Sequence, residues 1–323
     1  MIANLLDKFK GKKILVLGDV MLDQYVWGKV ERISAEAPVP VLEAQSEELR
    51  LGGAANVALN IHSLGGTPLL VGVTGADQAG EDLMELLEKK GISASGIQPD
   101  PSRGTTCKKR IGAANQQIVR IDYENRDDLS SSIRAKVLEK TLERLQNSDA
   151  LIIQDYEKGL LAEPLIREVL KAAKEQDIPV AVDPKLKNFQ AYEGVDIFKP
   201  NYNEFQAIRA TIFDSDEAFF RSAVELRKEL NFKNLIVTRS SLGMYIFNGD
   251  KEPRRIPTYA QEVFDPSGAG DTVISALTLA WTSGADIDLA AELANHAAGV
   301  VCGIKGTASV TPQQVLASYR DQK

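Results

Sequence analysis

Hydrophobic residues in this chain form short continuous runs that alternate with longer amphipathic stretches. The continuous runs occupy residues 13–20, 68–74, 150–154, 179–182, 197–199 and 235–238. They lack the alternation of half-exposed strands and are typical of strands buried on both faces, as in a parallel sheet. Helical patterns lie between them, at residues 53–64, 79–90, 131–146 and 164–176. This order predicts an α/β fold with a doubly wound, mostly parallel sheet and helices on both faces.

Two segments interrupt this alternation and predict a small second sheet. Residues 24–51 contain short β-prone pieces and two prolines without a helical pattern, and residues 103–123 predict a hairpin with an Asn/Gln turn. We expect the two insertions to form a lid on one domain that spans residues 1–323. Such a small sheet is poorly stable alone, and we expect it to expose a set of apolar side chains, namely Val26, Trp27, Val39, Val41 and Leu42.

Composition narrows the class of protein. The chain has 323 residues, a net charge of −7, 44% hydrophobic and 26% charged residues, which is typical of a soluble globular protein. Its pI of about 5.2 argues against broad binding of nucleic acid or of an anionic membrane. Two cysteines without CxxC spacing argue against a disulfide framework or a structural zinc site. Without a secretory signal pattern or an apolar run of about 20 residues, we expect a cytoplasmic location.

The segment FDPSGAGDT at residues 264–272 carries the strongest chemical signal, because a clear helical pattern follows it. Gly268, Ala269 and Gly270 therefore lie in a turn that opens a helix, where backbone amides bind anions. Asp271 lies in the first turn of that helix, beside any bound anion. A plain glycine-rich N-cap is the alternative interpretation. The segment is not a Walker A loop, and the first strand is not followed by a GxGxxG dinucleotide motif.

Polar residues follow the first strand and precede the first long helix. Ligands of open α/β sheets bind beyond the carboxyl ends of strands, so Asp19 and Asp23 are candidates to bind sugar hydroxyls. For Asp23, a solvated turn is the alternative. Gly52 and Gly53 would let a ligand approach the backbone, and Asn56 offers a donor and an acceptor. Tight helix–sheet packing by small residues is the alternative interpretation.

These motifs, in this order, resemble those of the ribokinase-like (PfkB) family of carbohydrate kinases. LGGAANVALNIHSLGG resembles the amino-terminal signature of the family, and DPSGAGDTVISA resembles the carboxy-terminal signature, with Pro266 as a departure from its usual form. Within the family, RISAEAPVPV, NQQIVRID and DYEKG most resemble the D-glycero-β-D-manno-heptose 7-phosphate kinases. Some proteins of that branch carry a second, nucleotidyltransferase domain, and this chain resembles their kinase half.

The resemblance implies that ATP, with Mg²⁺, phosphorylates the anomeric hydroxyl of the heptose 7-phosphate. The 1,7-bisphosphate product is a precursor of ADP-heptose for the lipopolysaccharide core. Asp271 would accept the hydroxyl proton, while the amides of residues 268–270 would stabilise charge on the transferred phosphoryl group. The residues implied in sugar binding are Asp19, Asp23, Gly52, Gly53, Asn56 and Asp155, and the basic candidates for the sugar's own phosphate are Arg120, Lys185, Arg32 and Lys108. A surface position is the alternative for Lys185, and a solvent-facing edge position for Arg120.

For the nucleotide, the resemblance points to residues 201–204 and to three later positions. Glu204 would bind hydrated Mg²⁺ through water. A capping box that joins Asn201 to Glu204 is a compatible second interpretation. The predicted nucleotide-binding residues are Asn201, Tyr202, Asn203, Glu204, Thr238, Arg239, Gly243 and Asn295. His296 is predicted to have a packing or surface role.

The resemblance also implies a homodimer that forms through the lids. The partners would then be ATP, a sugar phosphate and a second copy of the chain, without nucleic acid or membrane. Two other functions stay open at this point. One is a different PfkB kinase, acting on a fructose phosphate, a nucleoside or another sugar. The other is a kinase-like regulator without turnover, although Asp271 and the glycine turn are both intact.

Overall fold

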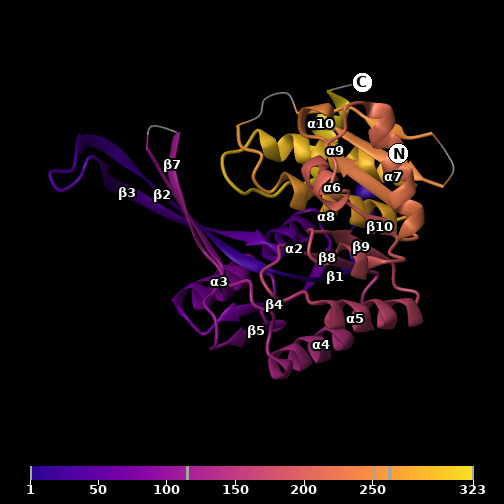
Figure 1. Cartoon of the computed structure of the whole chain (residues 1–323), viewed down its shortest axis with the longest axis horizontal. Helices are drawn as coiled ribbons and strands as arrows, with labels where there is room; N and C mark the ends of the chain where they lie inside the picture. Colours follow the sequence, from indigo (N-terminus) through magenta and orange to yellow (C-terminus); the bar gives the residue numbers. More distant parts are fainter. Residues whose placement is uncertain (1, 114–115, 250–251, 261–263, 322–323) are drawn as a thin grey trace.

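The computed structural model describes residues 2–113, 116–249, 252–260 and 264–321. Its larger sheet has nine strands, and neighbouring strands are parallel except in the two pairs at one edge, which are antiparallel. The apolar runs predicted as strands all lie in this sheet, so the predicted mostly parallel α/β architecture is confirmed (Figure 1). In spatial order the strands are β13 (Arg254–Ile256), β12 (Met244–Asn248), β11 (Asn234–Thr238), β10 (Ile197–Phe198), β9 (Val180–Asp183), β8 (Ala150–Gln154), β1 (Lys13–Gly18), β4 (Thr67–Gly75) and β5 (Ile97–Asp100).

Helices cover both faces of this sheet, and each face has its own hydrophobic core. In β1, Ile14 and Val16 belong to one core, while Leu15 and Leu17 belong to the other. This explains why the strand is apolar at every position. The first core packs under α1 (Ile2–Asp7), α2 (Ala54–Ser63), α3 (Gln78–Lys89), α8 (Ala269–Thr282), α9 (Ile287–Cys302) and α10 (Pro312–Arg320), and the second under α4 (Ser131–Leu145), α5 (Glu163–Glu175), α6 (Tyr202–Ile208) and α7 (Asp216–Glu229).

The smaller sheet has four strands and projects from the body of the molecule (Figure 1). Its order is β3 (Pro40–Gly53), β2 (Val20–Ile33), β6 (Cys107–Ala113) and β7 (Gln116–Tyr123). β6 and β7 are antiparallel, as expected of the predicted hairpin, although residues 114–115 of its Asn/Gln turn lie outside the described residues.

Two details of the smaller sheet differ from expectation. The short β-prone pieces are in fact two continuous strands of 14 residues, because β-bulges at Trp27/Gly28 and Val30/Arg32 absorb the irregular pattern. Val26 was expected on an exposed face but is 5% exposed. The exposed apolar side chains are Val30, Ile33, Val39, Ile118, Val119, Ile121 and Tyr123.

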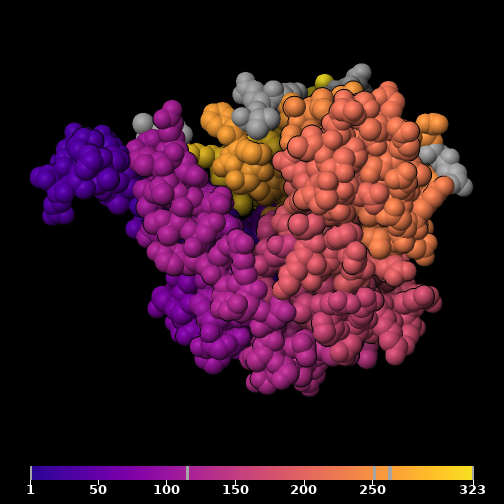
Figure 2. Space-filling model, in the orientation of Figure 1, coloured from indigo at the N-terminus to yellow at the C-terminus, as the bar shows by residue number. Residues whose placement is uncertain are grey.

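The connections between the two sheets bring the smaller sheet to the carboxyl edge of the larger one. A single residue, Asp19, separates the end of β1 from the start of β2. β3 leads directly into α2, whose amino terminus lies at the same edge. A hollow lies between the smaller sheet and the carboxy-terminal half of the chain (Figure 2). None of the helices in the described part of the chain has both the length and the apolar content needed to cross a membrane.

Candidate active site

Asp271 lies in the first turn of α8 and is 3% exposed. The helix begins after Gly268, whose φ of 82° lies in the left-handed region. A Cβ at this glycine would lie 2.8 Å from Asn56 Nδ2, so both the backbone conformation and the space favour glycine. This sharp start places the carboxylate of Asp271 against the ends of β8 and β9.

Both carboxylate oxygens of Asp271 accept hydrogen bonds. Asn56 Nδ2 donates to Oδ2 at 2.8 Å, while the Tyr156 hydroxyl and Gln154 Nε2 donate to Oδ1 at 2.8 and 3.2 Å. Burial raises the pKa of Asp271 to about 7, and the hydrogen bonds from Asn56 and Tyr156 oppose that shift. A carboxylate with a pKa near neutrality is suited to accept a proton from a hydroxyl group.

A buried ion pair lies beside Asp271. Lys199, 2% exposed, has its Nζ 3.1 Å from Asp183 Oδ1, and Gln154 Nε2 donates to Asp183 Oδ2 at 3.1 Å. Asp183 raises the pKa of Asp271, and Lys199 lowers it. A Cβ at Gly270 would lie 3.8 Å from Lys199 Nζ and from Asp183 Oδ2. The ion pair therefore faces the glycine turn.

Sequence reasoning did not select Gln154, Tyr156 or Lys199 as site residues. Gln154 ends β8, Tyr156 follows two residues later, and Lys199 comes directly after β10. Their position at the carboxyl ends of strands was an available signal, because open α/β sheets bind ligands at that edge. The position in a strand predicts that a side chain lies at the carboxyl edge of the sheet, but it does not predict which other side chain it contacts there.

Some backbone amides of the predicted anion-binding turn already donate hydrogen bonds within the turn. The Ala269 amide donates to the Pro266 carbonyl at 3.1 Å, and the Thr272 amide donates to the Gly268 carbonyl at 3.0 Å. Gly270 is exposed although the next residue is buried. The turn thus presents glycine backbone at the amino terminus of a 14-residue helix, next to the candidate base.

Asp19 and Asp155 are two further buried carboxylates, and they lie close enough for their charges to interact. Asp19, 3% exposed, accepts hydrogen bonds at Oδ2 from the amides of Tyr156 and Lys158, at 2.9 and 3.2 Å. Burial raises the pKa of Asp19 to about 6, and the charge of Asp155 adds to the shift. Asp155 is 1% exposed and accepts a hydrogen bond from the Tyr192 hydroxyl at 2.6 Å. Burial also raises the pKa of Asp155.

Asp23 is not a solvated turn residue, so that alternative is wrong. It lies within β2, is 3% exposed and forms an ion pair with Arg110 at 2.6 Å. Asp23 and Arg110 lie on the same face of the smaller sheet, since their strands are neighbours in register. A Cβ at Gly52 would lie 3.0 Å from Asp23 Oδ2, and Gly53, with φ of 56°, leads into α2. Arg110 is a further residue that sequence reasoning missed.

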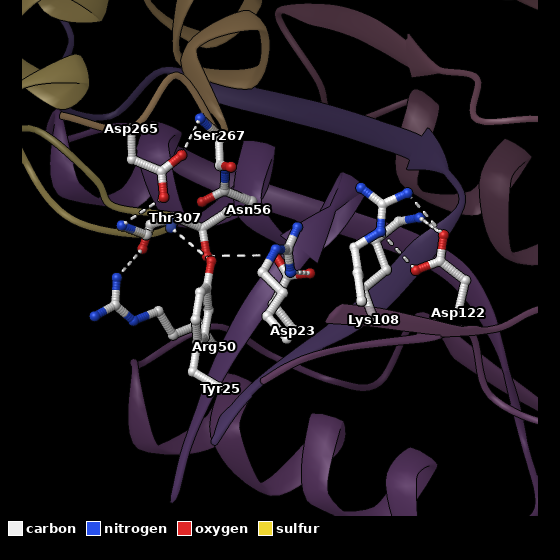
Figure 3. Close-up of polar contacts among 12 residues, drawn as sticks. Asp23, Tyr25, Arg50, Asn56, Lys108, Asp122, Asp265, Ser267 and Thr307 are labelled. Carbon is white, nitrogen blue, oxygen red and sulfur yellow. Dashed lines mark hydrogen bonds and ion pairs between the residues drawn. The ribbon is translucent and has the colours of Figure 1, made fainter. Parts of the chain in front are cut away.

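Three of the basic candidates for the sugar's phosphate lie on the smaller sheet. Arg120 donates two hydrogen bonds to Asp122, at 2.8 and 3.0 Å. Lys108 Nζ lies 3.2 Å from the same carboxylate (Figure 3). The Arg120 side chain is 47% exposed on the edge strand β7, on the same face of the smaller sheet as Arg110. Arg32 is exposed near the far end of β2.

A polar network joins the root of the smaller sheet to the segment after α9 (Figure 3). Arg50, at the end of β3, donates to the Thr307 carbonyl at 3.0 Å. Asp265 accepts hydrogen bonds from the Gly306 amide at 3.0 Å and from the Ser267 amide at 2.9 Å. The segment therefore contacts both the smaller sheet and the residues just before the glycine turn.

The predicted nucleotide residues at 201–204 begin α6. Asn201 and Glu204 form the predicted capping box, with bonds of 2.8 and 2.9 Å. Lys185 Nζ contacts Glu204 Oε1 and the residue is half-buried, so Lys185 is not the exposed surface lysine of the alternative. Burial lowers the pKa of Lys185, but the charges of Glu204 and Asp183 outweigh burial and raise it overall. Asn203 is exposed.

The other nucleotide candidates lie on two parts of the fold. Arg239 packs 4.2 Å above the ring of Tyr202 and lies 2.6 Å from Asp216. Thr238 ends β11, and Gly243, with φ of 86°, precedes β12.

On α9, Asn295 is 6% exposed and donates to the Pro257 carbonyl. His296 is 2% exposed and stacks on Tyr259 at 4.0 Å. Burial lowers the pKa of His296 to about 4. The predicted packing role of His296 is confirmed.

The sequence profile of the pfkB family carbohydrate kinases matches residues 11–314. This chain belongs to that family. It is therefore a carbohydrate kinase, a phosphotransferase whose acceptor is an alcohol group.

Curated relatives are similar over nearly the whole chain. The bifunctional protein HldE of Geobacter sulfurreducens is 42% identical over 304 residues, which are 94% of this chain and 62% of that protein. HldE of Histophilus somni is 43% identical over 304 residues, which are 94% of this chain and 63% of that protein. The chain thus spans less than two thirds of the length of these relatives.

Solved structures of kinases share the fold at low sequence identity. A ribokinase from Arabidopsis thaliana, complexed with ribose and ATP, superposes with a TM-score of 0.76 at 21% identity and covers 95% of this chain and 98% of its own. Phosphofructokinase-2 from Escherichia coli, in complex with potassium, gives a TM-score of 0.80 at 17% identity, covering 96% and 99%. The ribokinase-like α/β fold is thereby confirmed.

Proposed function

We propose that this pfkB-family kinase uses ATP to phosphorylate D-glycero-β-D-manno-heptose 7-phosphate at its anomeric hydroxyl. The product would be the 1,7-bisphosphate, used for ADP-heptose and the lipopolysaccharide core, and the location would be the cytoplasm. The observation that carries the kinase chemistry is the buried Asp271 at a glycine turn, with a pKa of about 7. The choice of sugar is supported by RISAEAPVPV and NQQIVRID and by the similarity to HldE proteins.

In this mechanism Asp271 orients the anomeric hydroxyl and accepts its proton as the new O–P bond forms. The nucleophile needs little activation in a loose phosphoryl-transfer transition state, so orientation contributes as much as basicity. Amides of residues 268–270 would hold the developing charge on the transferred group. The Ala269 amide donates to Pro266 in this structure, so that part of the turn has to open to bind phosphate.

The chain has residues that fit ATP and Mg²⁺. Each oxygen of Glu204 contacts one donor, from Lys185 or Asn201, and a carboxylate oxygen has a second lone pair for a water. Mg²⁺ keeps several waters and is held mainly by phosphates, so it does not need a cage of side chains. Accordingly, no group of three or more His, Cys, Asp or Glu side chains is placed to hold a metal in the described part of the chain. Thr238, Arg239, Gly243 and Asn295 would line the nucleotide.

Sugar binding is proposed for the buried carboxylates Asp19, Asp23 and Asp155, with Asn56, Gly52 and Gly53. Asp19 accepts hydrogen bonds at Oδ2, and Asp155 accepts two at Oδ2, from Tyr192 and Asn188, and one at Oδ1, from the Glu157 amide. A carboxylate has about four lone-pair sites, so each keeps acceptor capacity for a sugar hydroxyl. Arg120 and Lys108 would bind the sugar's phosphate when the smaller sheet closes as a lid. Both cations share one exposed carboxylate, Asp122, which a phosphate dianion can replace.

A homodimer through the smaller sheets is also proposed. β7 is an edge strand that exposes Ile118, Val119 and Ile121, at 43%, 45% and 38%. Unpaired edges and exposed apolar side chains favour association with a second copy. Sedimentation at micromolar concentration should give a dimer mass, and Val119→Glu should lower it to the monomer. A monomer mass for the unmodified protein contradicts this proposal.

The decisive experiment measures ATP consumption across a panel of sugars and sugar phosphates, with NMR assignment of the phosphorylated position. We expect turnover with the heptose 7-phosphate at C1. The second candidate is another pfkB kinase, favoured by the E. coli phosphofructokinase-2 fold match. Activity on a hexose phosphate without activity on the heptose 7-phosphate would establish that alternative. No consumption of ATP with any acceptor would favour a regulator without turnover.

A further inference from the structure

Tyr156 contacts groups from three parts of the site, although sequence reasoning gave it no role. Its amide donates to Asp19 Oδ2 at 2.9 Å, on the sugar side. Its hydroxyl donates to Asp271 Oδ1 at 2.8 Å. Its ring lies 5.3 Å from the Nζ of Lys185, which pairs with Glu204 on the nucleotide side. One residue of the segment after β8 thus contacts the sugar carboxylate, the base and the ion pair near the nucleotide.

We propose that Tyr156 is the positioning residue of this active site, which holds the Asp271 carboxylate in the orientation that receives the proton of the sugar hydroxyl. The inference rests on the proposed function, in which Asp271 is the base. It concerns the hydroxyl group of Tyr156, since the backbone and the ring make the other two contacts.

The segment that carries Tyr156 is held in one conformation. The Asp155 amide donates to the Asp183 carbonyl at 3.0 Å, which extends the pairing of β8 with β9. Glu157, which follows Tyr156 directly, has a φ of 54°, which is unusual for a residue other than glycine. Its amide donates to Asp155 Oδ1 at 2.8 Å, and its carboxylate accepts a hydrogen bond from the Lys187 amide at 2.7 Å. Such a conformation persists where the surroundings determine it.

The two oxygens of Asp271 are held differently. Asn56, which donates to Oδ2, is 0% exposed, and Asn60 donates to its carbonyl at 3.0 Å. Oδ1 accepts from the Tyr156 hydroxyl at 2.8 Å and from Gln154 at 3.2 Å, but Gln154 Nε2 also serves Asp183. The Tyr156 hydroxyl therefore makes the shorter hydrogen bond to Oδ1, and unlike the Gln154 amide it does not also donate to Asp183. Without it, Oδ1 keeps only the longer hydrogen bond from Gln154.

The charge around Asp271 gives a readout that a packing role would not change. The titratable groups that face it are Tyr156 after β8, Asp183 at the end of β9 and Lys199 after β10, while α2 presents the amide of Asn56. Tyr156 is a donor to the charged form of Asp271, so its removal raises the pKa of the base further. The base is then protonated at neutral pH, and activity returns at higher pH.

The test is Tyr156→Phe, which keeps the backbone contact and the ring. With ATP and the acceptor that gives turnover, we expect kcat at pH 7 to fall about 10- to 100-fold, with each KM within about threefold. The acid limb of the kcat profile should move up by about one pH unit. In the free protein, the ¹³C resonance of the Asp271 carboxyl group, assigned with Asp271→Asn, should titrate at a correspondingly higher pH.

Tyr192→Phe is the matched control, because it removes another buried phenol–carboxylate hydrogen bond, to Asp155. It should leave the acid limb and the Asp271 titration in place. An unchanged Asp271 titration in Tyr156→Phe, or an equal shift in Tyr192→Phe, overturns the inference. Failure of the proposed function is recognised separately, since Asp271→Asn would then retain turnover. The NMR titration decides the role of Tyr156 in either case.

Discussion

Charged side chains gather in two regions of this kinase, at the carboxyl edge of the larger sheet and on one face of the smaller sheet. At the edge of the larger sheet, Asp271 is 3% and Lys199 2% exposed, and hydrogen bonds hold the carboxylate at both oxygens. On the smaller sheet, the side chains of Arg120 and Asp122 are 47% and 26% exposed. The first region fixes its charges in place, whereas in the second the Arg120–Asp122 pair stays in contact with water and only the Arg110–Asp23 pair on the same face is largely buried.

The difference in burial suits the two regions to different roles, proton transfer and the binding of an anion. Burial shifts the pKa of a carboxylate and fixes its geometry, which proton transfer needs. An exposed ion pair contributes about 0 to 1 kcal/mol to stability, so an incoming anion can displace one partner at low cost. We therefore propose that the chemistry takes place at the edge of the larger sheet and that the smaller sheet would recognise the sugar's phosphate.

The largest expected effect is that of Asp271→Asn on turnover. We expect kcat to fall by about 10³-fold or more, because the variant loses the proposed base while it keeps the shape of the side chain. Near-normal turnover would remove Asp271 from its proposed role. Substrate binding, measured by calorimetry, should persist.

The same variant should be more stable than the unmodified protein at alkaline pH. Folding raises the pKa of Asp271 from 3.8 to about 7, so the fold disfavours its charged form. This penalty is complete above about pH 7 and disappears as the pH falls towards 4. Urea unfolding at pH 8 should show Asp271→Asn to be more stable by about 1 to 3 kcal/mol. The gain should vanish near pH 4, and a gain that is equal at both pH values would contradict the burial argument.

The next largest effect is expected for the buried ion pair. Lys199→Met leaves Asp183 without its cation beside Asp271, and we expect the free energy of unfolding to fall by about 3 kcal/mol. Lys171→Met is the control, because Lys171 is 77% exposed and its pairing distance is 3.9 Å. Urea denaturation of both variants at pH 7 makes the comparison. Equal losses would show that burial does not distinguish the two pairs.

Arg110 and Arg120 allow a matched comparison within the smaller sheet, where they lie opposite each other on neighbouring strands. The Arg110–Asp23 pair is 13% and 4% exposed, whereas Arg120 is 47% exposed. We expect Arg110→Met to cost about 2 kcal/mol of stability and Arg120→Met less than about 1 kcal/mol. Thermal unfolding of the two variants tests the order. A larger cost at Arg120 would show that burial does not determine how much these arginines contribute to stability.

The smallest expected effect is kinetic. Arg120→Glu should raise KM for the phosphorylated sugar by about tenfold, because it places a negative charge where the phosphate would bind. KM for ATP should change by less than about twofold. Arg167→Glu, on α5, controls for the change in net charge. Equal effects on both substrates would contradict the phosphate-binding role.

Local sequence patterns predicted the buried strands, the start of the helix that carries Asp271 and the capping box of this protein. The unbroken apolar run of β1 indicated burial on both faces, and alternate residues do enter two cores. The glycine turn before Asp271 and the spacing of Asn201 and Glu204 predicted a helix start and a capping box that the structure contains. These features depend on residues a few positions apart, so short segments carry the necessary information.

Only the tertiary structure decided which side chains meet. Asn56 and Tyr156 contact Asp271 from 215 and 115 residues away in sequence, and Arg110 reaches Asp23 from 87 residues away. Composition and spacing give no distance between such positions. A solvated turn stayed open as the alternative for Asp23 because its ion-pair partner comes from another insertion. Lys199 looked like the end of a strand because its partner lies on the neighbouring strand. Strand order and helix packing supply those partners, and with them the burial that sets the pKa of Asp271.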